Sequence, residues 1–442
     1  MMRGMGNVRK IRMRFGREGM ELRVPESATL LEGKPIPALA DPVQAVRQAL
    51  GSPIGSPPLR DLVRLRRPDS VAITISDITR PVPNHVILPA LLAELAAAGV
   101  RDQQVTILIA TGMHRPSTQA ERLEMIGPDV LDRVEVIDHV ADDAATMVRV
   151  SDDPPVSVCR RFVEADFRIV TGLIEPHFMA GYSGGRKGVC PGLVDLNTIK
   201  RFHGYRTLAH PLATTGVLEG NPCHEESLRV AKLVGVDFLV NVSIAHDRRL
   251  AGVYCGDMVE AHVAGVRDVA QWTTAVIDEP FDLIITNGGG YPLDQTFYQT
   301  VKGMVCALPA AHEGSTILLA SACAEGIGSP ECIATLMRWG LDWRGFLNHI
   351  ADPENFVKDQ WQFQCQARVL ERIGVERLCF FCDALPRDVQ RKLGVNPICG
   401  EGTVQERLQC AIDAYLASHT DARVAVIPEG PYTQLQPAES LV

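Results

Sequence analysis

Apolar residues occur along this chain in two patterns, which predict two kinds of secondary structure. Short continuous runs bounded by turn residues predict buried strands, and apolar residues spaced three and four apart predict amphipathic helices. Between residues 71 and 174 the two patterns alternate, which predicts a parallel sheet with helices on its faces. The predicted strands are Val71–Ile75, Val105–Ala110, Val134–Asp138 and Phe167–Ile174. The predicted helices cover His85–Ala98, the residues that follow a capping box at Thr118–Glu121, and Ser157–Glu164.

A second alternating series follows a polar junction at residues 270–282. Its predicted strands are Leu283–Thr286, Thr316–Ser321, Leu378–Cys382 and Arg423–Ile427, and its predicted helices are Glu331–Gly340 and Val404–Ala417. The chain opens with a predicted β-hairpin that turns at Arg17–Gly19. We therefore expect an α/β protein of two α/β domains with parallel-rich sheets. The expected domains are residues 1–275, residues 276–428, and a tail over 429–442 that packs back on the first domain.

Composition narrows the class of protein without identifying it. A length of 442 residues is enough for two or three domains. The net charge of −9 argues against a nucleic-acid-binding surface, which needs a basic stripe. No apolar run approaches the ~20 residues of a membrane helix, and the basic N-terminus lacks the apolar stretch of a secretory signal. The twelve scattered cysteines then indicate reduced thiols in a cytoplasmic protein. Cys379 and Cys382 have metal-site spacing, but their strand-like setting would point them apart.

Unusual polar residues follow three of the predicted strands. Asp77 and Arg80 come after the first, His114 after the second and His177 after the fourth. Ligands of open parallel sheets bind at the carboxyl ends of the strands, so we expect these residues to share a site. Each one alone has a simpler explanation as a turn, surface or structural residue. His246, His262 and His419 are interpreted as structural or exposed.

A glycine-rich loop, residues 180–188, comes shortly after the last of these segments. Its glycines would let backbone N–H groups approach a phosphate, which makes Ser183, Gly184 and Gly185 candidate cofactor-binding residues. The loop is not a Walker A motif, because Arg186 precedes Lys187 and a glycine follows it. A flexible turn with a solvated lysine remains an alternative. His203, on a predicted helix or at its end, has a side chain that suits nickel or zinc.

Five runs of the sequence together resemble the lactate racemase family. They are SDITRP, ATGMHRP, EPHFMAGYSGGRKGVCPG, GNPCHEE and YPLDQTFYQTVKGM, in the family's order and over most of the chain. The resemblance implies two α/β domains with the active site in the cleft between them. It also implies an isomerase, a racemase or epimerase that inverts C2 of a 2-hydroxyacid. The implied cofactor is a nickel-pincer nucleotide, pyridinium-3-thioamide-5-thiocarboxylic acid mononucleotide with nickel. Enzymes that mature this cofactor are the implied protein partners.

The resemblance also assigns roles to residues of this chain. Lys187 matches the lysine that tethers the cofactor, His203 matches the histidine that ligates nickel, and Asp77 matches a residue close to the cofactor. His114 and His177 match the two acid/base groups. The residues that match contacts to the substrate are Arg80 and Lys302 for the carboxylate, with Gln299, Tyr298 and Trp361 beside them; Trp361 rests on the loosest match.

These residue types suit inversion by hydride transfer. A transient 2-keto acid avoids a carbanion next to a carboxylate, and two histidines can serve the hydroxyl proton of either enantiomer. One alternative is a zinc hydrolase, with zinc held by His114, His177 and His203. Another is a homologue that binds the nickel cofactor without turnover. The sequence leaves the substrate open among lactate, malate, aryl or longer-chain hydroxyacids and sugar acids.

Overall fold

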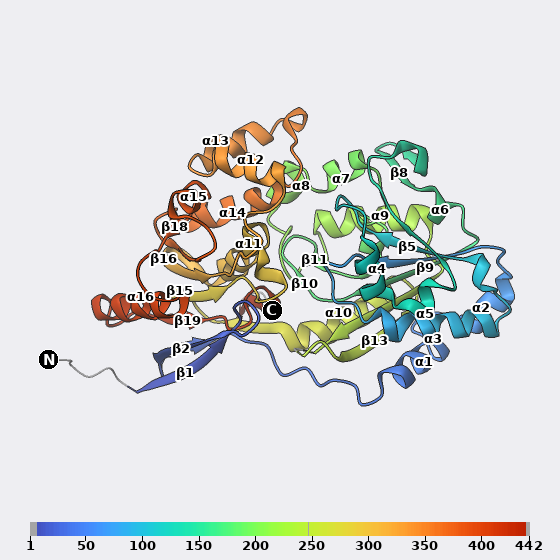
Figure 1. Cartoon of the computed structure of the whole chain (residues 1–442), viewed down its shortest axis with the longest axis horizontal. Coiled ribbons are helices and arrows are strands. Elements are labelled where there is room, and N and C mark those ends of the chain that lie inside the picture. The colour runs from blue at the N-terminus through green and yellow to red at the C-terminus, as the bar shows by residue number, and fades with distance from the viewer. Residues whose placement is uncertain (1–6, 246, 439–442) are drawn as a thin grey trace. The chain divides into compact units, whose positions relative to one another are not determined.

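The computed structural model describes residues 7–245 and 247–438 and divides them into two compact units. The central unit comprises residues 35–203 and 210–272. The terminal unit comprises the chain up to Lys34, residues 204–209, and the chain from Thr273 onward. Figure 1 shows parallel strands covered by helices in each of them. The predicted α/β class is confirmed.

The central unit is built on a six-stranded sheet with the order β6-β5-β4-β9-β12-β13. Its strands are β4 (Val71–Ser76), β5 (Val105–Ala110), β6 (Glu135–Asp138), β9 (Phe167–Leu173), β12 (Phe238–Ile244) and β13 (Leu250–Gly256). All neighbours pair in parallel except β12 and β13. The chain adds β5 and β6 on one side of β4, and then β9, β12 and β13 on its other side. The strand order therefore reverses between β4 and β9, which is where open α/β sheets bind ligands.

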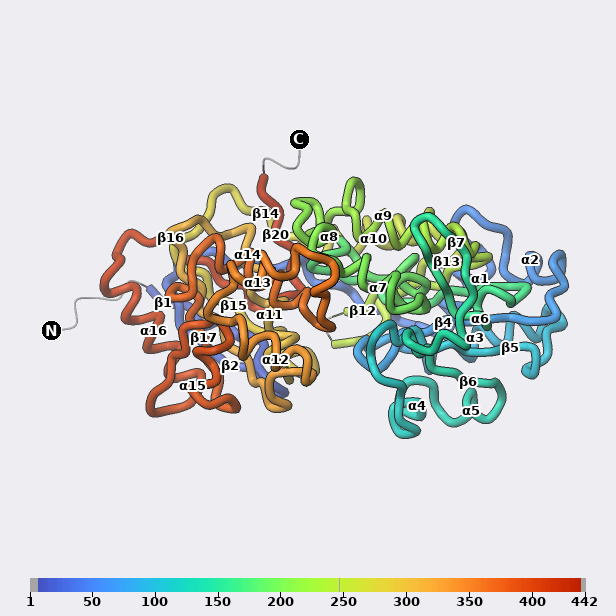
Figure 2. The backbone as a smooth tube through the Cα atoms, turned by 90° about the horizontal axis from the view of Figure 1, so that it is seen from above, coloured from blue at the N-terminus to red at the C-terminus, as the bar shows by residue number. Residues whose placement is uncertain are grey.

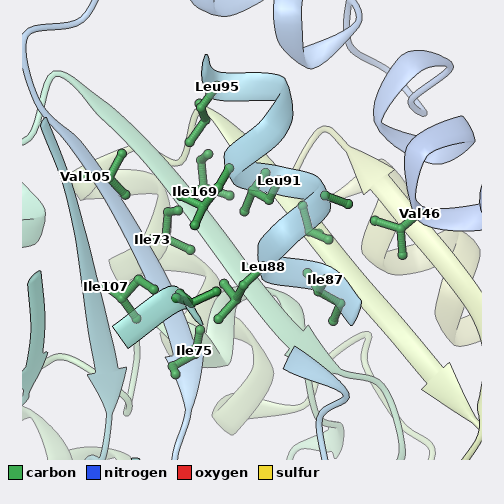
Figure 3. Packing of buried hydrophobic residues seen from close by; sticks show 14 of the residues in the cluster. Val46, Ile73, Ile75, Ile87, Leu88, Leu91, Leu95, Val105, Ile107 and Ile169 are labelled. Carbon is green, nitrogen blue, oxygen red and sulfur yellow. The ribbon is translucent and has the colours of Figure 1, made fainter. Parts of the chain in front are cut away.

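Apolar side chains cover one face of this sheet. Alternate residues of its strands, such as Ile73, Ile107 and Ile169, pack with Leu88 and Leu91 of a helix (Figure 3). This helix, α3 (Asn84–Ala97), shares the core with α1 (Pro42–Gly51), α2 (Leu59–Arg66) and α4 (Gln119–Ile126). The predicted capping box of α4 is confirmed. The Thr118 side chain accepts a hydrogen bond from the Glu121 N–H, and the Glu121 side chain accepts one from the Thr118 N–H. Further helices of the unit are α5 (Pro128–Leu131), α6 (Arg160–Val163), α7 (Leu196–Phe202), α9 (Pro222–Val234) and α10 (Glu260–Thr273).

The terminal unit has an all-parallel sheet with the order β18-β17-β16-β15-β19-β3. Its strands are β3 (Thr29–Leu30), β15 (Phe281–Asn287), β16 (Ala311–Ala320), β17 (Leu378–Phe381), β18 (Asn396–Pro397) and β19 (Val424–Val426). The hairpin of β1 (Val8–Met13) and β2 (Met20–Pro25) covers one face together with α16 (Val404–Ser418). The other helices of the terminal unit are α8 (Tyr205–Ala209), α11 (Phe297–Ala307), α12 (Pro330–Trp339), α13 (Trp343–Ile350), α14 (Gln360–Ile373) and α15 (Arg387–Lys392).

The structure corrects the predicted domains at both ends of the chain. The boundary at Thr273 lies within the predicted junction, but the segment up to Lys34 belongs to the terminal unit. The reason is that β3 pairs with β19 and that β1 and β2 pack on α16. The tail also stays in the terminal unit, because β20 (Gln434–Pro437) pairs with β14 (Thr274–Ile277), as Figure 2 shows. Residues 439–442 and His246 lie outside the described residues.

One predicted helix is wrong. Residues 157–164 contain the end of strand β8 (Pro155–Cys159), which pairs with β7 (Met147–Asp152), and only one short turn of helix, α6. The alternation of buried Val156 and Val158 with half-buried Ser157 is a strand pattern over that stretch.

Among the described residues, no helix is both long and apolar enough to cross a bilayer. All twelve cysteines are free thiols, and Cys382 is buried whereas Cys379 is half-buried.

Candidate active site

Three loops meet the carboxyl ends of three neighbouring strands in the central unit. Asp77 and Arg80 follow β4, His114 follows β5, and Glu175 and His177 follow β9. Because β5 and β9 pair with β4 on its two sides, these loops lie around the position where the strand order reverses. The predicted convergence of polar segments at one sheet edge is confirmed.

The Asp77 carboxylate fixes the orientation of His114. Asp77 is buried, and its Oδ2 lies 2.5 Å from His114 Nδ1, while its Oδ1 accepts a hydrogen bond of 2.5 Å from Thr79 Oγ1. Burial opposes ionisation, but the hydrogen bond and charge of His114, helped by Thr79, lower the pKa of Asp77. A carboxylate can only accept hydrogen bonds, so His114 carries a proton on Nδ1, and the neutral form of the ring has its lone pair on Nε2. His114 itself is exposed to solvent.

His177 has the opposite arrangement. It is buried, and its Nδ1 accepts hydrogen bonds from the backbone N–H groups of Met179 and Ala180, at 3.4 and 3.2 Å. Its neutral ring therefore carries the proton on Nε2. The turn that holds it pairs β10 (Pro176–His177) with β11 (Gly181–Tyr182). Thus the two candidate acid/base residues present different forms of Nε2, one an acceptor and one a donor.

The guanidinium of Arg80 already has an acidic neighbour. Arg80 Nη1 lies 3.3 Å from Glu175 Oε1, and both side chains are about four-fifths buried. The backbone of Glu175 is fixed by Ser183, whose Oγ accepts from the Glu175 N–H at 3.0 Å and whose own N–H donates to the Glu175 carbonyl at 3.0 Å. Sequence reasoning assigned Glu175 no role, since nothing in the sequence shows that it pairs with Arg80.

The glycine-rich loop lies flat on the sheet face opposite α3. A Cβ added to Gly184 would lie 2.6 Å from Asn241 Oδ1 on β12, and one added to Gly185 would lie 2.7 Å from the ring of His262 on α10. The N–H groups of Ser183, Gly185 and Lys187 donate within the protein, to Glu175, Asn241 and Gly184 respectively. The glycines are thus needed for close packing on the protein itself. The prediction that the glycines let backbone N–H groups approach a phosphate is not supported for the N–H groups of Ser183, Gly185 and Lys187, which already have acceptors within the protein.

Lys187 and His203 lie on neighbouring elements of the central unit. Lys187 belongs to the 3₁₀ turn η3 (Gly185–Gly188), and its Nζ lies 5.3 Å from the ring centre of Phe202. His203 directly follows Phe202 and ends α7. Burial, with the charges of Arg186 and Arg80, lowers the pKa of Lys187 to about 7. Burial, with the charge of Lys187, lowers the pKa of His203 to about 3. Near neutral pH, His203 is therefore neutral, and Lys187 has far more of its free amine form than an exposed lysine has.

Electrostatic effects connect these residues into one neighbourhood. The charge of Arg80 acts on both Asp77 and Lys187, and the charges of Lys187 and His114 both act on His203. Asp77, Arg80, His114, Lys187 and His203 are thus within electrostatic range of one another, and His177 lies on the loop that follows the adjacent strand β9. Within residues 7–245 and 247–438, no three His, Cys, Asp or Glu side chains are grouped closely enough to hold a metal ion, so His114, His177 and His203 are not arranged as a three-ligand site.

The terminal unit places the remaining candidate residues on two helices. Helix α11, which starts beyond the carboxyl end of β15, carries Tyr298, Gln299 and Lys302. Trp361 on α14 donates a hydrogen bond of 2.9 Å from Nε1 to the Tyr298 hydroxyl. Burial, and the nearby carboxylate of Asp359, raise the pKa of Tyr298 well above its ordinary value. The structure therefore brings Tyr298 and Trp361 together, although the sequence match for Trp361 is loose.

Comparison with known proteins shows the family of this chain. The family model for the lactate racemase N-terminal domain matches residues 15–216, and the model for the lactate racemase C-terminal domain matches residues 276–432. The chain belongs to the lactate racemase family. Lactate racemase of Lactiplantibacillus plantarum is 34% identical over 405 residues, which cover 88% of this chain and 89% of that protein. Lactate racemase of Thermoanaerobacterium thermosaccharolyticum is 32% identical over 390 residues, or 87% of this chain and 88% of that protein.

Solved structures agree with the family assignment. The lactate racemase apoprotein of T. thermosaccharolyticum matches with a TM-score of 0.86 and 29% identity, covering 97% of this chain and all of that one. A Thermotoga maritima protein has a TM-score of 0.65 at 17% identity over 92% of this chain, and this likeness concerns the fold alone. Membership in the lactate racemase family makes this chain an isomerase of the racemase type. The relatives therefore do not support the alternative of a homologue that binds the nickel cofactor without turnover.

Proposed function

We propose that this racemase inverts C2 of a 2-hydroxyacid through a transient 2-keto acid. Removal of the C2 hydrogen as hydride avoids the carbanion that proton abstraction beside a carboxylate would create. A nickel-pincer nucleotide, when bound, supplies the electron-poor pyridinium carbon that accepts and returns the hydride. The observation that carries the proposal is the opposite hydrogen bonding of the two histidines, His114 through Asp77 and His177 through backbone N–H groups.

The two rings would act on the hydroxyl oxygen of the substrate. His114 offers the lone pair of Nε2 as a base, and Asp77 stabilises the cation that forms when the ring takes up the proton. His177 offers Nε2–H as a donor to the carbonyl oxygen that results. Since the two rings come from loops on opposite sides of β4, each can serve one orientation of the substrate.

The substrate carboxylate needs cations, and each unit supplies one candidate. The Arg80 guanidinium can bind a carboxylate through two parallel N–H groups. Lys302 on α11 is the matching residue in the terminal unit, where Gln299, Tyr298 and Trp361 are the further proposed substrate contacts. We propose a small 2-hydroxyacid as substrate; which one the chain prefers is the question for the assay below.

The residues of the central unit fit the proposed cofactor. A lysine whose pKa is lowered to about 7 exposes a substantial fraction of free amine near neutral pH, which suits a nucleophile for a covalent tether, and Lys187 has that pKa. A neutral imidazole is a suitable nickel ligand, and burial keeps His203 neutral. Lys187 would hold the cofactor and His203 would bind its nickel, with Asp77 nearby.

Maturation enzymes are the proposed partners, and twelve free thiols are in keeping with a cytoplasmic location.

Intact-mass analysis of protein produced with the maturation enzymes tests this proposal. We expect a mass adduct that maps to Lys187, one nickel per adduct, and interconversion of enantiomers in a chiral assay over mono-, di- and polyhydroxy acids. Lys187→Ala should fold but carry no adduct, whereas Lys232→Ala, at an exposed lysine of α9, should behave as wild type. Active protein with an unmodified Lys187 would refute the tether, and bound zinc with hydrolytic activity would refute the function.

A further inference from the structure

The loop that carries Lys187 is fixed by buried side chains that the proposed chemistry does not use. Asn241 on β12 and His262 on α10 are 0% and 3% exposed, and Arg186, within the loop itself, is 1% exposed. Asn241 and His262 are far from the loop in sequence: Asn241 is 56 residues from Gly185, and His262 is 79 residues from Ser183. Polar groups are seldom buried this fully without a specific set of partners, so their contacts indicate a role.

Each of these side chains holds a different point of the loop backbone. Asn241 Oδ1 accepts a hydrogen bond of 2.7 Å from the Gly185 N–H. His262 Nε2 lies 2.9 Å from the Ser183 carbonyl, which can only accept, and 3.2 Å from Arg186 Nη1, which can only donate. The shorter contact places the ring proton on Nε2, which then donates to Ser183 and leaves Arg186 Nη1 as a neighbour that makes no hydrogen bond to this nitrogen. Arg186 Nη2 donates to the Ala180 carbonyl at 2.8 Å and so connects the start of the loop with its end.

The backbone on either side of Lys187 is fixed as a result. The Lys187 N–H donates to the Gly184 carbonyl at 3.2 Å, and the Lys187 carbonyl accepts from the Gly192 N–H at 3.2 Å. Gly184 cannot move toward β12, and Gly185 cannot move toward α10, because Asn241 and the His262 ring already fill the space that a single added carbon would need. The direction in which the Lys187 side chain leaves the loop is therefore set by Asn241 and His262.

We propose that His262 and Asn241 are positioning residues, which aim the Lys187 amine for its covalent bond to the cofactor. The inference rests on the proposed function, in which Lys187 is the tether. In bond formation between two held groups, a displacement of about 1 Å can cost about 100-fold in rate. Freeing the loop should thus slow attachment strongly while the nickel-ligand residue His203, on a different element, keeps its place.

Four variants test the inference. His262→Leu removes the donor to Ser183 with little change of volume, and His262→Gln restores a donor near the place of Nε2. Asn241→Leu removes the acceptor for Gly185. Val242→Ala, on the same strand but on the face that packs with α3, is the control for general loss of stability.

The first measurement uses apoprotein and needs no cofactor. Hydrogen exchange of a peptide covering residues 180–192 should be at least about tenfold faster in His262→Leu and Asn241→Leu, and near wild type in His262→Gln and Val242→Ala. The second measurement is the rate of adduct formation on Lys187, read by intact mass during maturation. It should fall about 10- to 100-fold in the two leucine variants, a range typical of lost supporting contacts.

The outcomes separate the inference from the function on which it rests. Faster exchange with an unchanged rate of adduct formation would overturn the positioning role, and so would an equal loss in Val242→Ala. Unchanged exchange in both leucine variants would overturn it as well. Absence of any adduct in wild-type protein would instead count against the proposed tether, while the exchange data would still report on the loop.

Discussion

At the scale of single residues, the two oxygens of Asp77 have separate partners, and this decides what an amide would do there. Thr79 donates to Oδ1 through both its N–H and its hydroxyl, so in Asp77→Asn the oxygen must stay on that side. The new NH₂ group would then face His114 Nδ1 and force this nitrogen to accept, which moves the ring proton to Nε2. We expect kcat to fall about 100-fold or more, the typical contribution of a positioned base.

Two measurements check this prediction. Nitrogen NMR of His114 in apoprotein should report Nδ1–H in wild type and Nε2–H in Asp77→Asn, and the chiral assay should report the loss of turnover. Thr118→Ala, which removes a helix cap in the same region without touching the pair, serves as control. Wild-type turnover together with a changed tautomer would remove His114 from the role of base.

Glu175 makes a second prediction at this scale. Its carboxylate competes with any substrate carboxylate for Arg80, because it lies 3.3 Å from the guanidinium in the structure. An ion pair of this kind contributes up to about 1 kcal/mol, or roughly fivefold in affinity. Glu175→Gln should therefore lower KM up to about fivefold for a monocarboxylate, whereas Glu164→Gln, in the exposed pair with Arg160, should not. A raised KM in steady-state assays would mean that Glu175 assists binding.

At the scale of elements, the sequence predicts strands well where apolar runs are continuous and poorly where pairing is local. The sequence predicts strands β4, β5 and β9 to within one residue at each end, because both of their faces are largely buried and their apolar runs are uninterrupted. The helix predicted at 157–164 failed because pairing between β7 and β8 outweighs helical spacing over so short a stretch. The short α6 is what remains of it.

The candidate site shows the same division between local and distant causes. The polar loops after β4, β5 and β9 could be predicted to converge, because the carboxyl ends of parallel strands share one edge. The contacts of Asn241 and His262 with the loop at 180–188 could not, because they join segments more than fifty residues apart. From the sequence alone, His262 is accordingly interpreted as structural or exposed. A buried asparagine within the apolar run of β12 was the signal available for Asn241.

The start of α4 makes a prediction about pH. Glu121 caps this helix through Thr118 and pairs with Arg115, which directly follows His114. The hydrogen bond from Arg115, together with those from Thr118, lowers the pKa of Glu121 from 4.5 to about 2. A lowered carboxyl pKa contributes stability that is present above the unfolded value of 4.5 and is lost as the pH falls toward 2. Hydrogen exchange over residues 112–126, corrected for its intrinsic pH dependence, should therefore rise between about pH 4.5 and 2. Glu121→Gln should abolish this change, and an equal rise in that variant would contradict the assignment.

At the scale of the whole molecule, the position of a segment along the chain does not decide which unit it belongs to. The hairpin β1–β2 precedes every strand of the central unit, yet Leu22 is 0% exposed in the core that holds Leu408 and Ile412 of α16. Leu22→Ala should cost about 2–5 kcal/mol, the usual range for a buried leucine. Because each unit has its own core, we expect the loss to appear in residues of the terminal unit and not in β4 or α3 of the central unit.

Site-resolved hydrogen exchange distinguishes these possibilities. Peptides from α16 and β19 should exchange faster in Leu22→Ala, while those from β4, β5 and α3 should keep wild-type rates. Glu21→Ala is the matched control, since its side chain is half exposed and pairs with the exposed Lys10 on the hairpin surface. Faster exchange confined to β4 and α3 would mean that the N-terminal segment stabilises the central unit. Residues 7–34 would then have to be assigned by sequence position, as in the predicted domain of residues 1–275, and not by the core that they complete.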